Sequence, residues 1–348
     1  MLQETYLQDL RTDYPSRLDP DQVRLTQTGL LSAVIEMTAS PMSIVSDDLI
    51  AQARQSVGRQ LDVPVMQKGI VTLKSVRSCT VDCAQSTSGF VTITFRTLVA
   101  DMCIVPSQYK KNEIARLTDM NRKITDIVEK FLVTIEEDLD TALDANKSQV
   151  YNSPIVGDKY ALTAGAIQVP VAEQDHFFND LEPINYSDDF YNTTVKMISS
   201  PSMMSPINKY INQGAGNDEN TNYQFAGKDF RFSNRITNTS PAKSTGYFMP
   251  EGSIGFVTRI DPDAMDNNEA TDGTRWFEDR LPGMPFSVGI KYNSKCSDQS
   301  ALESNGLEHL TATMIEHWQI SFDYAIIVPY NSDLATRPSS IRKVEFVA

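Results

Sequence analysis

The stretch from Ser107 to about Tyr151 constrains the fold most, because its apolar residues recur at helical spacing without a Gly or Pro between 107 and 150. A helix of roughly forty residues would be about 60 Å long. A compact globule of this chain length would be only about 50 Å across. The sequence therefore predicts a flat or elongated subunit, a shape that exposes edges to neighbours.

One face of this helix carries an apolar stripe, which we interpret as core packing. A coiled coil is a weaker alternative, because the stripe is no cleaner at a spacing of 3.5 than at 3.6 residues. The acidic run Glu136-Glu137-Asp138 with Asp140 is expected to be a solvated face. The stripe consists of Ile114, Leu117, Ile124, Val128, Phe131, Ile135 and Leu139.

Two β-rich runs precede the helix and predict a long hairpin. Val65 to Val81 is the first arm and Phe90 to Val99 the second, with a polar turn at Ala84–Gly89. In the second arm Phe90, Thr92, Thr94 and Arg96 alternate with Val91, Ile93, Phe95 and Thr97. Because an isolated two-stranded hairpin is marginally stable in water, we expect it to rest on another surface.

The N-terminal part predicts an arm followed by a short helix. Residues 1–45 are punctuated by Pro15, Pro20 and Pro41 and are expected to be extended. Ser46 can cap a helix that runs to about Gln60 and ends at Asp62-Val63-Pro64.

Residues 153–305 are rich in loops and predict an α+β subdomain. We expect a helix over Asp188–Met197 and another over Ile207–Ile211. Trp318–Val328 predicts a half-buried strand, and Ile341–Val347 is expected to pair beside it. Further short strands are expected at Phe230–Ile236, Gly246–Met249, Gly255–Ile260 and Phe286–Tyr292.

Charge and hydropathy narrow the functional classes. The net charge of −14 argues against nucleic-acid binding as the main activity, because binding phosphates needs basic clusters. No apolar run approaches eighteen residues and no signal region is recognisable, so we expect neither a membrane span nor export.

The sequence offers little for catalysis or metal binding. The three histidines, His176, His309 and His317, fit no paired-ligand spacing, and Asp261–Asp266 lacks key ligands of a calcium loop. We expect no catalytic residue, cofactor or metal. The four cysteines, expected to be free thiols of a reducing compartment, are Cys79, Cys83, Cys103 and Cys296.

The order of these parts resembles the major capsid protein of tailed bacteriophages, which has the Hong Kong 97-type capsid fold. Three late segments, Tyr223–Ser233, Gly246–Gly255 and Trp318–Ala325, also resemble strands and turns of that family. The resemblance implies an α+β fold with an N-arm (1–45), a short helix (46–62), an E-loop hairpin (63–106), a spine helix (107–155), an axial domain (156–305) and C-terminal strands of the peripheral domain (306–348).

The resemblance also implies a structural role and partners. The chain would form pentamers and hexamers of an icosahedral or prolate head shell that encloses double-stranded DNA, assembled in the bacterial cytoplasm. Portal protein, separate or already removed scaffolding, a protease and decoration proteins would be partners. Assembly residues would lie in the hairpin, where Lys68 and Lys74 are also weak candidates for the Lys–Asn crosslinking of some members. The residues assigned to this interface are Lys68, Leu73, Lys74, Ile93 and Phe95.

Three alternatives stay open. An encapsulin-like compartment would share the fold but need a cargo-docking groove. A secreted binding or adhesion protein would be expected to show a signal peptide or disulfides. An enzyme would need a constellation that the sequence does not show.

The hairpin assignment makes a direct prediction. Leu73→Asp or Ile93→Asp should block assembly more than it lowers subunit folding, because a charge would enter a surface that only a neighbour covers. Sedimentation of the assembled protein, compared with urea unfolding of the subunit, measures the two effects.

Overall fold

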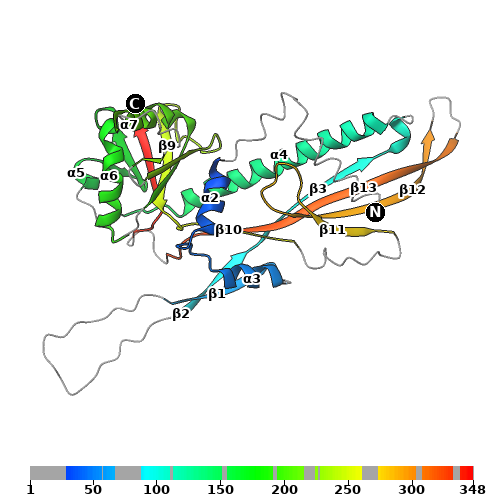
Figure 1. Ribbon diagram of the computed structural model, residues 1–348, viewed down its shortest axis with the longest axis horizontal. Helices are drawn as coiled ribbons and strands as arrows, with labels where there is room; N and C mark the ends of the chain where they lie inside the picture. The colour runs from blue at the N-terminus through cyan, green and yellow to red at the C-terminus, as the bar shows by residue number, and fades with distance from the viewer. Residues whose placement is uncertain are drawn as a thin grey trace, which may run out of the picture.

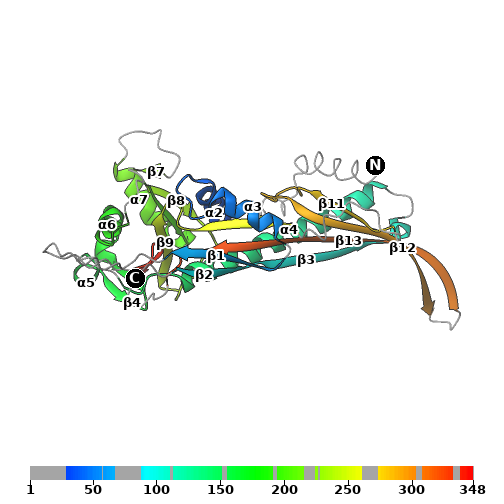
Figure 2. The same ribbon diagram turned by 90° about the horizontal axis from the view of Figure 1, so that it is seen from below.

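The computed structural model shows an elongated molecule with a rounded body at one end and a long body of a helix on a sheet (Figure 1). The structure describes residues 29–56, 58–66, 88–109, 113–150, 155–190, 194–214, 224–225, 228–260, 273–302, 308–331 and 338–347. The same view turned by a right angle shows that the long body is thin (Figure 2). The elongated shape predicted from the long helix is confirmed.

Helix α4 spans Glu113–Ala145 and lies along the long body. Its 33 residues correspond to about 50 Å. It is shorter than predicted at both ends, because Pro106–Tyr109 forms a separate 3₁₀ turn and the chain leaves the helix to reach the rounded body. There the Ser148 N–H donates to the Ile341 carbonyl at 2.9 Å.

The sheet beneath α4 is formed by β3 (Arg96–Ile104), β10 (Gly255–Arg259), β11 (Arg275–Asp279), β12 (Val288–Leu302) and β13 (Glu308–Ile327). Strand β13 is central and pairs antiparallel with β3, β10 and β12, while β11 pairs with β12. The predicted strand Trp318–Val328 is the second half of β13.

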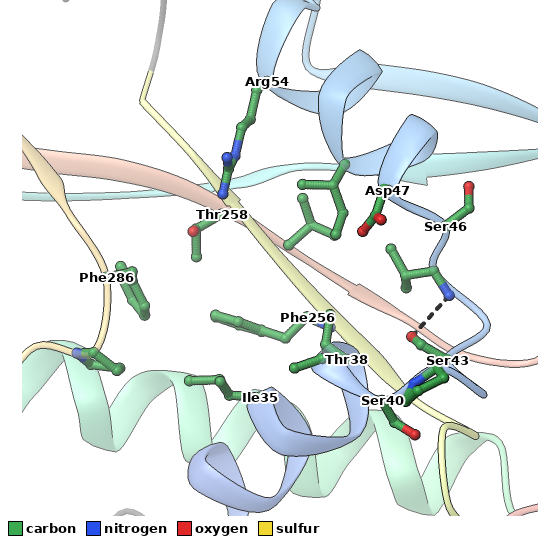
Figure 3. Close-up of a pocket in the computed structure, with 16 residues that line it drawn as sticks. Ile35, Thr38, Ser40, Ser43, Ser46, Asp47, Arg54, Phe256, Thr258 and Phe286 are labelled. Atoms are coloured by element: carbon green, nitrogen blue, oxygen red, sulfur yellow. Dashed lines mark hydrogen bonds between the residues drawn. The ribbon is translucent and has the colours of Figure 1, made fainter.

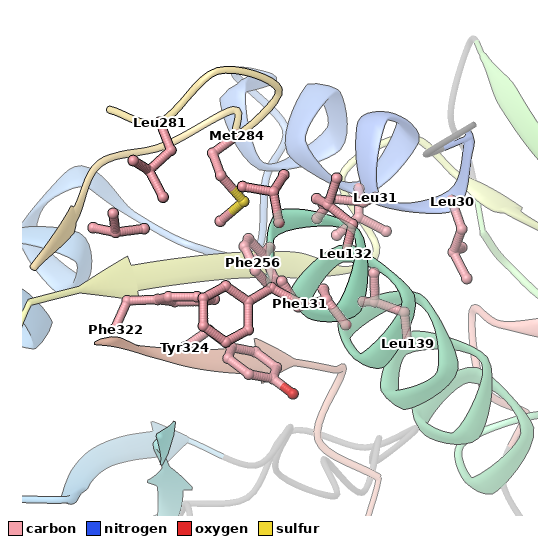
Figure 4. Close-up of a cluster of buried hydrophobic side chains, with 14 of the residues drawn as sticks. Leu30, Leu31, Phe131, Leu132, Leu139, Phe256, Leu281, Met284, Phe322 and Tyr324 are labelled. Carbon is pink, nitrogen blue, oxygen red and sulfur yellow. The ribbon is translucent and has the colours of Figure 1, made fainter. Parts of the chain in front are cut away.

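The apolar stripe of α4 packs between this sheet and a second helix (Figure 4). The Phe131 ring meets Phe322 of β13 edge-on, with ring centroids 5.2 Å apart. Five of the predicted stripe residues are buried: Ile124, Val128, Phe131, Ile135 and Leu139. The prediction of core packing is therefore confirmed for these residues.

The second helix is α2 (Gly29–Ala39), and it corrects the prediction that residues 1–45 are an extended arm. Leu30, Leu31 and Val34 are buried in the core against α4. At Gly29 the helix approaches β8 so closely that a Cβ would lie 1.8 Å from the Phe232 carbonyl oxygen. The arm prediction can hold only for residues 1–28, which lie outside the described residues.

Glu136 is also not solvated, contrary to the sequence prediction, and is only 1% exposed. Its carboxylate accepts hydrogen bonds from the Leu31 N–H at 2.8 Å and from the Ser233 hydroxyl. It thus binds the first turn of α2, where free N–H groups and the helix dipole favour an acceptor. Burial raises the pKa of Glu136, although these hydrogen bonds oppose the shift.

The hairpin begins earlier than predicted. Strand β1 (Gln60–Met66) pairs with β2 (Ser88–Thr94), so Asp62-Val63-Pro64 lies inside a strand and does not end a helix. The short helix α3 (Asp47–Gln55) is capped by Ser46 as predicted. The predicted turn at 84–87 and most of the first arm lie outside the described residues.

The rounded body contains a seven-stranded sheet in the order β4-β5-β14-β9-β6-β8-β7 within the described residues. Helices α6 (Gln174–Ser187) and α7 (Met204–Gly214) cover one face of it. Smaller helical pieces are α5 (Ile155–Asp158) and 3₁₀ turns at Val171–Glu173 and Pro201–Met203. The strands are β4 (Ala161–Thr163), β5 (Ala166–Pro170), β6 (Val195–Ser199), β7 (Gln224–Phe225), β8 (Lys228–Phe232), β9 (Lys243–Pro250) and β14 (Arg342–Val347).

Two predictions about this region are wrong. The helix expected over Asp188–Met197 is not found in its described residues: α6 has already ended at Ser187, and Val195 begins β6, whose five residues are all buried because both faces of the sheet are covered. Ile341–Val347 does not pair beside the Trp318 strand. As β14, it lies between β5 and β9 in the other sheet.

The domain boundary drawn at 305/306 does not separate the two sheets. Strands β10, β11 and β12, assigned to the axial domain by sequence, belong to the sheet of β13, whereas β14 belongs to the rounded body. The chain crosses between the bodies several times, which a division into consecutive segments cannot represent.

We predict that Glu136 makes stability depend on pH. Because its pKa is raised in the folded state, the folded chain binds more protons than the unfolded chain between the two pKa values. The contribution of Glu136 to the free energy of unfolding should therefore fall as pH rises through this window. Glu136→Gln, which can keep both hydrogen bonds, should remove that dependence.

Urea unfolding of both proteins from about pH 4 to pH 8, around the ordinary Glu pKa of about 4.3, measures this. Glu137→Gln is the matched control, since Glu137 is exposed on the same helix. Parallel pH profiles for wild type and Glu136→Gln would contradict the assignment.

Candidate assembly surfaces

The described strands of the hairpin β1–β2 run away from the sheet of β13 and contact the rest of the chain at the root and along α3 (Figure 1). At the root, the buried Arg259 of β10 donates to Asp323 of β13 at 3.0 Å, and its guanidinium lies 4.1 Å from the centre of the Phe95 ring. Asp323 also accepts from the Thr97 hydroxyl at 2.6 Å. This buried ion pair fixes the point where β2 ends and β3 begins.

The inner face of the root is covered by α3. Ile93 and Phe95, two of the residues assigned to the interface by sequence, are 9% and 3% exposed and pack with Leu49 and Ala53 of α3. The structure thus gives both side chains partners within their own chain. Lys68, Leu73 and Lys74 lie outside the described residues.

Over the described strands, the outer face of the hairpin has no such cover. Phe90 is 76% exposed, and Asp62, Pro64, Thr92 and Thr94 are exposed on the same face. The Thr92 hydroxyl donates to the Asp62 carboxylate at 2.5 Å. This hydrogen bond holds the carboxylate against β2, the strand that carries Phe90. The alternation of inner and outer residues predicted for this strand is confirmed.

A groove of about 560 Å³ opens on the other side of α3 (Figure 3). Its apolar surface comes from α2, β10 and the segment before β12, with Ile35, Phe256 and Phe286 turned into it. Arg54 reaches into the groove from the last turn of α3 beside Thr258, and Asp47 lies at the first turn. Within the described part of the chain, Arg54 has no hydrogen-bond or ion-pair partner.

A second ribbon, formed by β12 and β13, projects from the end of the long body that lies far from the rounded body (Figure 2). Strand β11 pairs with β12 only over Val288–Tyr292, and β3 pairs with β13 only over Glu316–Tyr324. From Asn293 to Leu302, β12 therefore has β13 as its only neighbour among the described strands. The described chain thus has two two-stranded ribbons, β1–β2 beside α3 and β12–β13 at the end of the long body, and two-stranded ribbons are weakly stable without further contacts.

Few side chains among the described residues are placed for catalysis or metal binding. Cys103 is free and exposed, and its Sγ lies 3.2 Å from Nδ1 of His317 on the neighbouring strand. No group of three or more His, Cys, Asp or Glu residues in the described ranges is arranged to hold a metal ion. His176 lies on α6, while Cys79, Cys83 and residues 261–266 lie outside the described residues.

Within the described ranges, no helix combines the length and apolar character needed to cross a membrane.

Comparison with known proteins identifies the fold. No protein-family model and no curated protein matches the chain. The cyanophage A-1(L) capsid asymmetric unit matches with a TM-score of 0.50 at 10% identity, over 92% of this chain and 92% of that one. A structure of Mycobacterium phage Che8 matches with a TM-score of 0.49 at 10% identity, over 87% and 88%. The likeness to the cyanophage structure shows that this chain has the α+β fold of a phage capsid protein.

Sequence reasoning missed α2 and the groove beside it. Leu30, Leu31, Val34 and Met37 recur at helical spacing, a signal that could have found the helix. No sequence signal brings Arg54 near Phe256 and Phe286, because those residues meet only through the packing of α2, α3 and β10.

The burial of Ile93 within its own chain leads to a prediction that replaces, for this residue, the one made from sequence. Ile93→Asp should lower the free energy of unfolding by about 3 kcal/mol or more, because an unpaired carboxylate would enter the cluster with Leu49 and Ala53. Thr94→Asp, at the next and exposed position, should change it by about 0.5 kcal/mol or less. Equal urea midpoints for the two variants would show that α3 does not cover Ile93.

Proposed function

We propose that the chain is a structural capsid protein that assembles with copies of itself into the head shell of a tailed phage. The fold supports this proposal, and so do the exposed apolar side chains on two ribbons of the subunit. The observation that carries the proposal is that a thin subunit carries two two-stranded ribbons, β1–β2 beside α3 and β12–β13 at the end of the long body, with exposed apolar residues such as Phe90 and Met314 on them. Exposed apolar surface of this kind marks protein–protein contacts.

In the terms of that fold, β1–β2 belongs to the E-loop and α4 is the spine helix. The seven-stranded sheet is the axial domain, and the sheet of β13 is the peripheral domain. The extent of each segment is proposed from the sheets and differs from the sequence boundaries in placing β10–β12 peripherally and β14 axially. Residues 1–28 would be the N-arm.

The proposed shell consists of pentamers and hexamers and encloses double-stranded DNA without reading its sequence. The net charge of −14 suits a container that holds DNA without binding it tightly. Portal protein, scaffolding or a protease, and decoration proteins are the proposed partners, with assembly in the host cytoplasm. The role is structural, and we propose no enzymatic activity and no cofactor.

An encapsulin-like compartment is the alternative within the same fold. It would need a site that docks a cargo peptide inside each shell. The apolar groove beside α3 is the described feature that could serve, so the content of purified shells decides between the two. Nuclease-protected DNA favours the phage shell, and a protein cargo favours the compartment.

Purified protein should form rings, capsomers or shells many times heavier than one chain. Negative-stain microscopy and light scattering over a concentration series measure this directly. A protein that stays monomeric at high concentration, with a protease-resistant β1–β2 hairpin, would contradict the proposal.

A further inference from the structure

We propose that the groove beside α3 receives the β1–β2 hairpin of a second copy, with Phe90 in its apolar part and Asp62 beside Arg54. The inference rests on the proposed self-assembly and names the residues that make one of its contacts.

The hairpin offers an apolar group and an acid on one face. Phe90 and Pro64 are directly paired in the register, and Thr92 and Asp62 form the next pair on that face. Phe90 and Asp62 are therefore diagonal neighbours across the two strands, and such neighbours lie about 7 Å apart. The outer face therefore presents an aromatic ring, 76% exposed, with a carboxylate about 7 Å away.

The groove offers the complementary set. Ile35, Phe256 and Phe286 line its apolar part, and the guanidinium of Arg54 lies at one end (Figure 3). A volume of about 560 Å³ is within the range of about 300–1,000 Å³ that holds a ligand-sized group, so a phenyl ring with part of its strand fits. Asp47 lines the other end of the groove and would repel a second carboxylate there. The hairpin is therefore expected to enter in the orientation that places Asp62 at Arg54.

The hairpin of the same copy cannot make this contact. Its inner face is fixed to α3 through Ile93 and Phe95, while Phe90 points to the opposite side. The root is also held by Arg259 and Asp323. Reaching the groove on the far side of α3 would require this buried root to open, so the occupant is a second copy.

Aromatic anchors that fill pockets at interface centres carry much of the binding energy, and charged pairs at the edge fix the register. Phe90 would supply the anchor, and the Asp62–Arg54 pair would set how far the hairpin enters. Repetition around a ring would give each copy one occupied groove and one docked hairpin.

A charge exchange tests the pairing. Asp62→Arg and Arg54→Asp should each raise the concentration at which assembly begins by about tenfold or more, because each puts like charges together. The chain with both substitutions should regain most of the assembly. In that chain Arg at position 62 of one copy faces Asp at position 54 of the next, so opposite charges pair again. Light scattering against protein concentration measures all four proteins.

A second pair of variants tests the anchor. Phe90→Ser should impair assembly by at least about tenfold, whereas Val99→Ser, which removes another exposed apolar residue on β3, should leave it within about twofold. Both residues are exposed, so circular dichroism and thermal unfolding should match the wild type.

The results separate this inference from the proposed function. If wild type assembles and the double exchange fails to restore assembly, or if Phe90→Ser assembles normally, the groove contact is overturned and the capsid role stands. If wild type itself forms no assembly, the proposed function fails.

Discussion

The apolar side of α4 is the constraint on which the rest of the structure depends. It packs against β13 on one side, where Phe131 meets Phe322, and against α2 on the other. The bond from the Leu31 N–H to Glu136 fixes the position of α2 along the helix. Because α2 also touches β8, the helix holds the long and the rounded bodies together.

The two bodies are joined through a shared sheet as well. In β6 and β9, neighbouring residues alternate between the two cores: Met197 and Phe248 face α6, while Ile198 and Tyr247 face α2 and α4. A sheet covered on both faces resists bending between the bodies. The two bodies are therefore held together by packed secondary structure, and the two-stranded ribbons β1–β2 and β12–β13 extend from them.

The sequence predicts this fold where the signal is local. The stripe of α4, the cap at Ser46, the alternation around Ile93 and the long strand through Trp318 all follow from spacing within one segment, and the order of segments indicates the fold class. The sequence fails where long-range contacts decide. Ile341–Val347 has the pattern of any buried strand, so its pairing partner is set by the path of the chain, and Glu136 resembles a surface acid until α2 covers it.

The residues expected at the assembly interface could likewise be predicted from sequence only in part. Alternation along β2 separates inner from outer side chains, but it does not say which face is covered by the same chain. Helix α3 decides that, by covering Ile93 and Phe95 and leaving Phe90 exposed. The groove is built from three stretches distant in sequence, which are α2 with α3, β10, and the segment before β12, and no local pattern brings them together.

The position of β14 has a consequence for synthesis. It fills the gap between β5 and β9, and its Glu345 accepts a hydrogen bond from Gln168, 177 residues earlier. The rounded body therefore cannot complete its sheet before residues 342–347 have been synthesised. A chain cut short by interrupted translation would lack this strand, and such a fragment could not present a finished subunit to its neighbours.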